Sequence, residues 1–197
     1  KQELSLSDGF VITVLFWIVL SVSGSIPFLL FGFGVVDSFF ESMSGITTTG
    51  ATVISGLDDL PKSLLIYRQL LQWLGGMGLI VLAIAVMPLL GIGGGQLFKT
   101  QTPGPMSEQR LTPRITSTAR ALWSIYFVLT VLCIFAYRLA GMNNFDAVSH
   151  AFSTVSIGGF STHDLSIGFF DSLSIEIVCI TFMLLSAMSF AVHYSAI

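Results

Sequence analysis

Charged side chains are scarce in this chain. Only 10% of its 197 residues are Asp, Glu, Lys or Arg, whereas soluble domains carry about 25%. Hydrophobic residues make up 53% of the chain and the mean hydropathy is +0.87. This composition excludes an ordinary soluble domain and favours a chain that uses lipid as its solvent. The net charge of −3 excludes no class of partner by itself, and we expect no nucleic-acid partner.

Disulfide and enzyme signatures are also lacking. The two cysteines, Cys133 and Cys179, lie inside apolar runs, which is typical of small buried side chains rather than of a disulfide framework. No His-Glu-x-x-His metalloprotease motif is present. Ser44-Gly45 lacks the preceding glycine of a rhomboid-type Gly-x-Ser-Gly motif, because Ser42 occupies that place. The sequence therefore predicts no enzyme, and an intramembrane enzyme or a passive membrane scaffold are the alternatives from other classes.

Long apolar stretches are what the chain has instead. A helix needs about 20 mostly apolar residues to cross a bilayer, and four segments reach this length. The first is longer than the apolar region of a signal peptide, which has about 7–15 residues. The second begins with polar side chains, so only its later part is expected deep in lipid. The four predicted spans are Asp8–Phe31, Leu64–Leu90, Ala119–Leu139 and Asp171–Val192.

Two shorter segments lie between these spans. One runs from Asp37 to Thr52 and the other from Asp146 to Ser161. Each opens with an aspartate that we expect to cap a helix, a role worth about 1 kcal/mol. Each then continues for ten residues and ends in small residues and glycine. Ten helical residues cover about 15 Å, half a bilayer, so each segment should enter the membrane and return on the same side.

A shift of 109 residues superimposes the two halves of the chain. It carries Asp37 onto Asp146 and Gly50 onto Gly159, and it lays each span on a span without gaps. Internal repeats are common in transport proteins, where the site lies between the repeats. We therefore predict an all-α membrane fold of tandem repeats, each a transmembrane helix, a re-entrant pore helix with filter loop, and a second transmembrane helix. The predicted divisions are a first repeat at 1–95, a cytoplasmic linker at 96–118 and a second repeat at 119–197.

Charge is distributed unevenly along the loops. Residues 91–120 hold four bases and one acid, so the positive-inside rule places this loop in the cytoplasm and makes both short segments enter from outside. The opposite face is acidic and is expected to raise the local concentration of cations. Its acids are Asp37, Glu41, Asp58, Asp59, Asp146, Asp164 and Asp171.

The glycine-ended loops predict a cation site. Backbone that is not helical is tolerated inside a bilayer only where protein or water surrounds it. Glycine reaches backbone angles that let successive carbonyls point the same way, and a ring of carbonyls can replace the water around a monovalent cation. The C-terminal end of each short helix adds about half a negative charge. The predicted filter residues are Thr47, Thr48, Thr49, Gly50 and Ala51, and in the second repeat Ser156, Ile157, Gly158, Gly159 and Phe160.

Other glycines and histidines are expected to have structural roles. Gly75, Gly76 and Gly78 are typical of a surface where two helices pack closely. His150 and His163 lie in and just beyond the second short segment, and we interpret both as packing or surface residues rather than as ligands.

Several sequence runs together resemble one family of transporters. The combination is similar to the TrkH subunits of the bacterial Trk potassium uptake system, within the Trk/Ktr/HKT superfamily. The Thr-Pro-Gly-Pro and Leu-Thr-Pro-Arg runs favour the TrkH branch over its KtrB relatives. The matching runs are Phe40–Thr52, Gln72–Gly78, Thr102–Pro105 with Leu111–Ile115, and Phe152–Thr162.

The resemblance implies four repeats around one potassium pore in the bacterial inner membrane, each with a key glycine that corresponds here to Gly50 or Gly159. It also implies a homodimer and a cytosolic nucleotide-binding TrkA ring as regulatory partner. Potassium would be the substrate, with no cofactor in this chain. This sequence holds two repeats, so the remaining two pore repeats are expected in the same polypeptide. The potassium ion is assigned to the carbonyls of Thr48, Thr49, Ile157 and Gly158.

Selectivity itself does not follow from the residues. Carbonyl rings bind both potassium and sodium, and the preference depends on geometry. A sodium- or proton-coupled cation transporter therefore stays as the alternative function.

Overall fold

A computed structural model describes residues 6–86 and 115–188, and within these ranges the chain is helical with no strand. The first half contains α1 (Leu6–Leu30), α2 (Val35–Ile46), the short 3-10 helix η1 (Leu57–Asp59) and α3 (Lys62–Val86). The second half contains α5 (Ile115–Leu139), α6 (Asn144–Val155), the 3-10 helix η2 (Ser166–Phe170) and α7 (Leu173–Ala187). The predicted all-α fold is confirmed.

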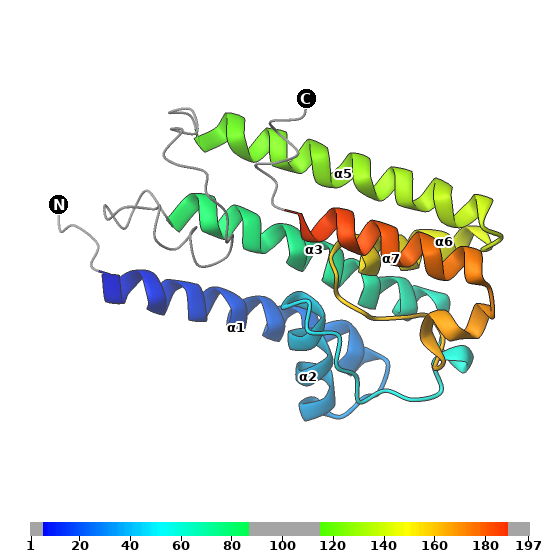
Figure 1. Ribbon diagram of the computed structural model, residues 1–197. Helices are drawn as coiled ribbons and strands as arrows, with labels where there is room; N and C mark the ends of the chain where they lie inside the picture. The colour runs from blue at the N-terminus through cyan, green and yellow to red at the C-terminus, as the bar shows by residue number, and fades with distance from the viewer. Residues whose placement is uncertain (1–5, 87–114, 189–197) are drawn as a thin grey trace.

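The long helices lie side by side, and the two short helices pack among them. Figure 1 shows α1 and α5 beginning at the end of the bundle where α3 and α7 finish. The short α2 packs against α1 and α3, while α6 packs against α3, α5 and α7. Helix α3 therefore touches both short helices, one from each half of the molecule.

The internal repeat is confirmed in the first two helices of each half. Helices α1 and α5 both have 25 residues and helices α2 and α6 both have 12, and their bounds differ by the predicted 109 positions. The backbone repeats as well. Thr48 and Ile157 have φ angles of 55° and 54°, and Gly50 and Gly159 have φ angles of 76° and 85°. Two sequences that differ in most side chains thus adopt one backbone path.

Helices α1 and α5 have the length and composition of membrane spans. The apolar windows run from Phe10 to Leu30 and from Leu122 to Leu139, and only 17% and 28% of their residues are buried within the protein. Their large hydrophobic side chains therefore face outward, which is stable in lipid and unfavourable in water. Helix α7 is apolar but has 15 residues in the described part of the chain.

Helix α5 extends into the predicted linker. It begins at Ile115, so residues 115–118 are helical. Three of these four residues carry hydroxyl groups, which is why hydropathy places the start of the span at Ala119. The rest of the predicted linker, the boundary at 95 and most of the basic loop lie outside the described residues.

Glycines allow α3 to fit between the ends of the two short helices. A Cβ atom on Gly75 would lie 1.9 Å from the Ile46 carbonyl oxygen, at the end of α2. A Cβ on Gly76 would lie 2.8 Å from the Tyr126 hydroxyl and 3.1 Å from the Ser156 Cβ, just after α6. The predicted close packing is confirmed at these two positions. Gly78 makes only ordinary contact, with Trp17 at 3.9 Å.

This contrast gives a matched pair of variants. Gly75→Ala should lower the free energy of unfolding in detergent by about 1–3 kcal/mol, because the new methyl group meets backbone that cannot move aside. Gly78→Ala should be neutral, or stabilising by up to about 1 kcal/mol through helix propensity. Equal stabilities for the two variants would show that α3 does not press against the end of α2.

Candidate ion-binding site

The two short helices begin earlier than predicted. Asp37 is not a cap: the N-cap of α2 is Gly34, and Asp37 lies in the first turn. The N-cap of α6 is Asn143, whose Oδ1 accepts a hydrogen bond from the Asp146 backbone N–H at 2.9 Å. Asp146 is also in the first turn, and its carboxylate accepts from the Thr162 hydroxyl at 2.7 Å. The predicted capping roles were wrong because acids are favoured both at the cap and in the first turn, through the helix dipole.

The backbone that follows α2 turns its N–H groups back onto the helix. The Thr49 and Gly50 N–H groups both donate to the Ser44 carbonyl, at 2.9 and 3.4 Å. In the second repeat the Gly158 N–H donates to the Ser153 carbonyl at 2.8 Å. These bonds satisfy carbonyl groups in the last turn of each short helix. The carbonyl groups of the filter segments themselves are not used in these bonds.

Positive φ angles alternate with ordinary ones along each segment. Thr48 and Ile157 are non-glycine residues in the left-handed region, a conformation that needs surrounding structure to hold it,. Within the described ranges, no hydrogen bond reaches the carbonyl oxygens of Thr48, Thr49 or Ile157. These three oxygens keep their capacity to bind a cation, as predicted for a filter.

The two filter segments touch each other. A Cβ on Gly50 would lie 1.9 Å from the Gly158 carbonyl oxygen and 3.5 Å from the Gly159 Cα. Only glycine at position 50 permits this approach. The structure therefore places the predicted segments side by side, although they are more than 100 residues apart in the sequence.

Gly158 differs from the other predicted potassium ligands. Its carbonyl oxygen accepts a hydrogen bond from Gln72 Nε2 at 2.8 Å. The Gln72 Oε1 in turn accepts from the Phe160 N–H at 3.0 Å. The Gly158 oxygen thus has a protein partner, unlike the oxygens of Thr48, Thr49 and Ile157. A carbonyl oxygen has two lone pairs, so its assignment to the potassium ion stays a prediction.

The outer ends of both segments are anchored rather than open. The Ala51 carbonyl accepts from the Ser44 hydroxyl at 2.6 Å. The Phe160 ring is 2% exposed and lies 4.3 Å from the guanidinium carbon of Arg68. Thr47 and Ser156, at the inner starts of the segments, use their hydroxyls on the preceding helix turn, at 2.7 and 2.8 Å. Among the predicted residues, Thr48, Thr49 and Ile157 are the candidate ligands whose carbonyl oxygens have no other partner in the described ranges.

The first repeat contains a fully buried ion pair whose arginine also bonds to the second repeat. Arg68 and Glu41 are both 0% exposed, with 2.6 Å between Arg68 Nη2 and Glu41 Oε1. Arg68 also donates to the Thr52 hydroxyl and to the Ser161 carbonyl, both at 3.0 Å. Thr52 and Ser161 are equivalent positions of the repeat. One side chain on α3 therefore fixes the same point of both filter segments.

The partner of this anchor differs between the repeats. Glu41 accepts a hydrogen bond from the Thr52 hydroxyl at 2.8 Å. His150, its equivalent in α6, bonds through Nε2 to the Ser161 hydroxyl at 2.9 Å and is 1% exposed. The prediction that His150 is a packing residue is confirmed. Glu41, in contrast, is not part of an acidic outer surface as predicted, because its charge is buried and paired.

The outer loops of the repeats are also tied together. Asp58 bonds to His163 Nδ1, and this hydrogen bond holds the pKa of the Asp58 carboxyl below its usual value of 3.8. The Asp164 carboxylate accepts from the Gly56 and Leu57 N–H groups at 3.0 and 3.2 Å, at the start of η1. No group of three or more potential metal-ligating side chains occurs in the described part of the chain. These acids therefore act mainly as links between loops.

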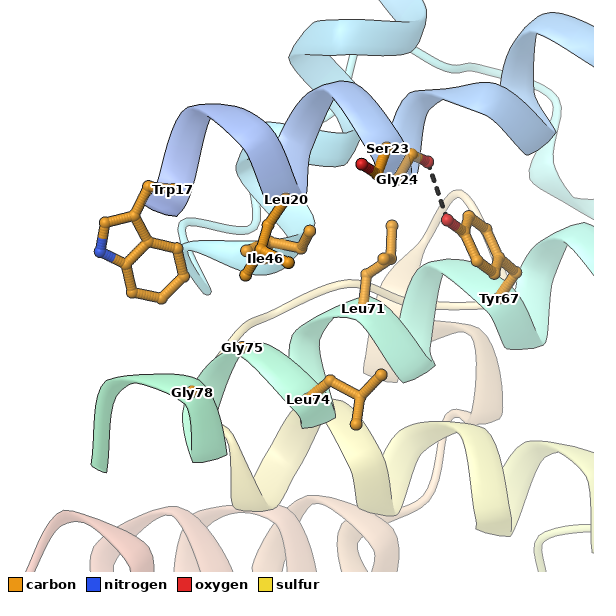
Figure 2. Close-up of a pocket in the computed structure, with 10 residues that line it drawn as sticks. All are labelled: Trp17, Leu20, Ser23, Gly24, Ile46, Tyr67, Leu71, Leu74, Gly75 and Gly78. Carbon is orange, nitrogen blue, oxygen red and sulfur yellow. Dashed lines mark hydrogen bonds between the residues drawn. The ribbon is translucent and has the colours of Figure 1, made fainter. Parts of the chain in front are cut away.

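An apolar groove of about 300 Å³ lies between α1 and α3, and Ile46 at the end of α2 also lines it. Figure 2 shows its lining, with Trp17 at one end and the hydrogen bond from the Tyr67 hydroxyl to the Gly24 carbonyl at the other. No charged side chain lines it. Its chemistry does not suit a cation.

Comparison with known proteins agrees with this geometry. The model of the TrkH family, described as a cation transport protein, matches residues 1–197. The chain belongs to the TrkH family. It is 58% identical to the Trk system potassium uptake protein TrkH of Halomonas elongata and 52% identical to that of Escherichia coli K12, over 100% and 99% of this chain. The crystal structure of the potassium transporter TrkH from Vibrio parahaemolyticus superimposes with a TM-score of 0.83 at 55% identity and covers all of this chain.

The chain spans less than half of these TrkH-family relatives. It covers 41% of the length of both curated proteins and 39% of the crystallised chain. The features described here therefore correspond to one part of each of these longer relatives.

Sequence reasoning missed the buried polar face of α3. The polar side chains at the start of the second span were expected to lie near water rather than deep in lipid. All three of them, Arg68, Gln69 and Gln72, are 0% exposed. The signal was available, because Arg68 and Gln72 are one helical turn apart within an apolar helix. An ionisable residue in such a place is by default functional and has a buried partner. The partner, Glu41, could not be identified without the fold.

Removing one member of the buried pair should be costly. Arg68→Met leaves the Glu41 carboxylate buried without its partner, and we expect a loss of about 3–5 kcal/mol in the free energy of unfolding. The double variant Arg68→Met/Glu41→Gln should lose less, because no charge is left uncompensated. Denaturant unfolding of the purified protein measures both. Additive losses would contradict direct pairing.

Proposed function

We propose that this chain forms half of the lining of a potassium uptake pore in the bacterial inner membrane. The observation that carries the proposal is the pair of equivalent filter segments, which touch at Gly50 and Gly158. Each follows a helix of 12 residues, about 18 Å long, which reaches roughly the middle of a bilayer. The carbonyls of Thr48, Thr49 and Ile157 are the proposed potassium ligands.

The electrostatics favour a cation at this point. Both short helices direct their negative C-terminal ends at the filter segments. The one base that approaches the segments, among the described residues, is Arg68, and its charge is compensated by Glu41 at 2.6 Å. A dehydrated monovalent cation would exchange its water for carbonyl oxygens. An anion would meet the same oxygens and be repelled.

Two segments cannot surround an ion, so the remaining ligands must come from elsewhere. The curated relatives are more than twice as long as this chain, which leaves room for two further repeats in the same polypeptide. We propose that these complete the ring of carbonyls. The names of the relatives as Trk system proteins support a TrkA-type cytosolic ring as regulatory partner. We propose a homodimer as the assembly.

The alternative is a sodium- or proton-coupled cation transporter, since carbonyl oxygens accept either ion. The full-length protein that contains this chain, reconstituted in liposomes, distinguishes the two. Uptake of rubidium and potassium in preference to sodium, without a proton gradient, is expected for the potassium pore. Sodium preference, or uptake that requires a proton gradient, would contradict it.

The key glycine of the second segment offers a sharper test. A Cβ at Gly159 would meet nothing within 4 Å, but the φ angle of 85° is one that serine resists,. Gly159→Ser should therefore distort the filter through its backbone and reduce the potassium-to-sodium flux ratio. A preserved ratio would mean that Gly159 does not shape the ion path.

Gly141 supplies the matched control for this variant. Its φ angle is 109° and its Cβ would also meet open space, but it lies in the turn before α6, outside the filter. Gly141→Ser carries a similar backbone strain, so it should lower stability without changing selectivity. Equal losses of selectivity in both variants would attribute the effect to general destabilisation.

A further inference from the structure

Gln72 holds the second filter segment from the opposite repeat. It lies on α3 of the first repeat, is 0% exposed, and uses both atoms of its amide on the filter. Nε2 donates to the Gly158 carbonyl at 2.8 Å, and Oε1 accepts from the Phe160 N–H at 3.0 Å. The two bonds lie on either side of Gly159, the left-handed glycine of this segment.

The contact is close as well as polar. A Cβ on Gly158 would lie 2.3 Å from the amide carbon of Gln72 and 2.4 Å from its Oε1. The glycine at 158 is therefore needed to let the amide lie flat against the filter backbone. A donor on one side of Gly159 and an acceptor on the other side fix the orientation of both flanking peptide groups.

The second repeat has no equivalent of this support. The repeat shift carries Gln72 onto Thr181 and Arg68 onto Ile177, and Ile177 is 55% exposed. The backbones of the two repeats match, but the polar face of α3 is not copied onto α7. Among the described residues, this support therefore comes from α3 and has no counterpart on α7.

We propose that Gln72 is a positioning residue that sets ion specificity, by clamping the backbone on both sides of Gly159. It does not contact the ion. It keeps the Ile157 carbonyl and the turn at Gly159 in the geometry that suits one size of cation. The inference rests on the proposed function as a potassium pore and adds to it the residue that determines selectivity in the second segment.

Gln69 provides a matched control on the same helix. It is also 0% exposed, but its amide nitrogen and oxygen have no hydrogen-bond partner among the described residues. Gln72→Met and Gln69→Met thus make the same chemical change at the same burial. Only the first removes two hydrogen bonds to the filter.

The experiment measures relative fluxes of potassium, rubidium and sodium through the full-length protein in liposomes. Gln72→Met should lower the potassium-to-sodium flux ratio by about tenfold, a change that the loss of two neutral hydrogen bonds can account for. Gln69→Met should keep the wild-type ratio. A wild-type ratio in Gln72→Met would overturn the inference, while a wild-type protein without potassium preference would instead overturn the proposed function.

A second variant decides the matter if Gln72→Met does not fold. Gln72→Glu has the same shape; its neutral acid can donate and accept, as the amide does, whereas its carboxylate can only accept. The buried charges beside it, Arg68 and Glu41, are paired with each other. We expect a wild-type flux ratio at acidic pH and a fall in the ratio as the pH rises through the pKa of the new acid.

Two outcomes of this titration count against the clamp. In the first, the potassium-to-sodium flux ratio of Gln72→Glu equals that of the wild type at every pH, with both proteins measured under the same conditions. In the second, the ratio is low and does not recover in acid although the protein remains folded. Either result would mean that donation to the Gly158 carbonyl does not control selectivity.

Discussion

Backbone that leaves a helix inside a membrane has no water to satisfy it, and the arrangement of this protein depends on how that backbone is held. The filter must leave its middle carbonyls free for an ion, so its other polar groups need partners from protein. The short helices accept the N–H groups at the inner end. In the second repeat further partners come from α3, because Arg68 donates to the Ser161 carbonyl and Gln72 to the Gly158 carbonyl. In the first repeat Arg68 reaches the Thr52 hydroxyl, while the Ala51 carbonyl accepts from Ser44 of α2.

The choice of a buried charge for this task has a physical cost. Removing an arginine and a glutamate from water is unfavourable, and an apolar pair of the same shape is often as stable. A guanidinium, however, offers five donors in a fixed plane. Arg68 uses them on Glu41, Thr52 and Ser161 at once. We interpret the main role of the pair as holding the filter segments in position rather than stabilising the fold, because Arg68 bonds to the equivalent ends of both segments.

The repeat and the backbone of the site could be predicted because they depend on local signals. Hydrophobic length, half-membrane segments and the shift from Gly50 to Gly159 need no knowledge of contacts. The capping aspartates were misplaced by one turn, because caps and first turns favour the same residue. The role of α3 could not be predicted, since Arg68 and Gln72 acquire their partners only when segments far apart in sequence meet. The hydrogen bond between Gly158 and Gln72 could not be predicted for the same reason.

The central claim is that the free carbonyls of the two filter segments bind the transported ion. Anomalous diffraction from crystals of the full-length protein grown in rubidium tests it most directly. The account predicts a rubidium peak within coordination distance of the Thr48, Thr49 and Ile157 oxygens, with Gln72 still bonded to Gly158. A peak remote from these oxygens, or a Gly158 carbonyl that has left Gln72 to bind the ion, would contradict it.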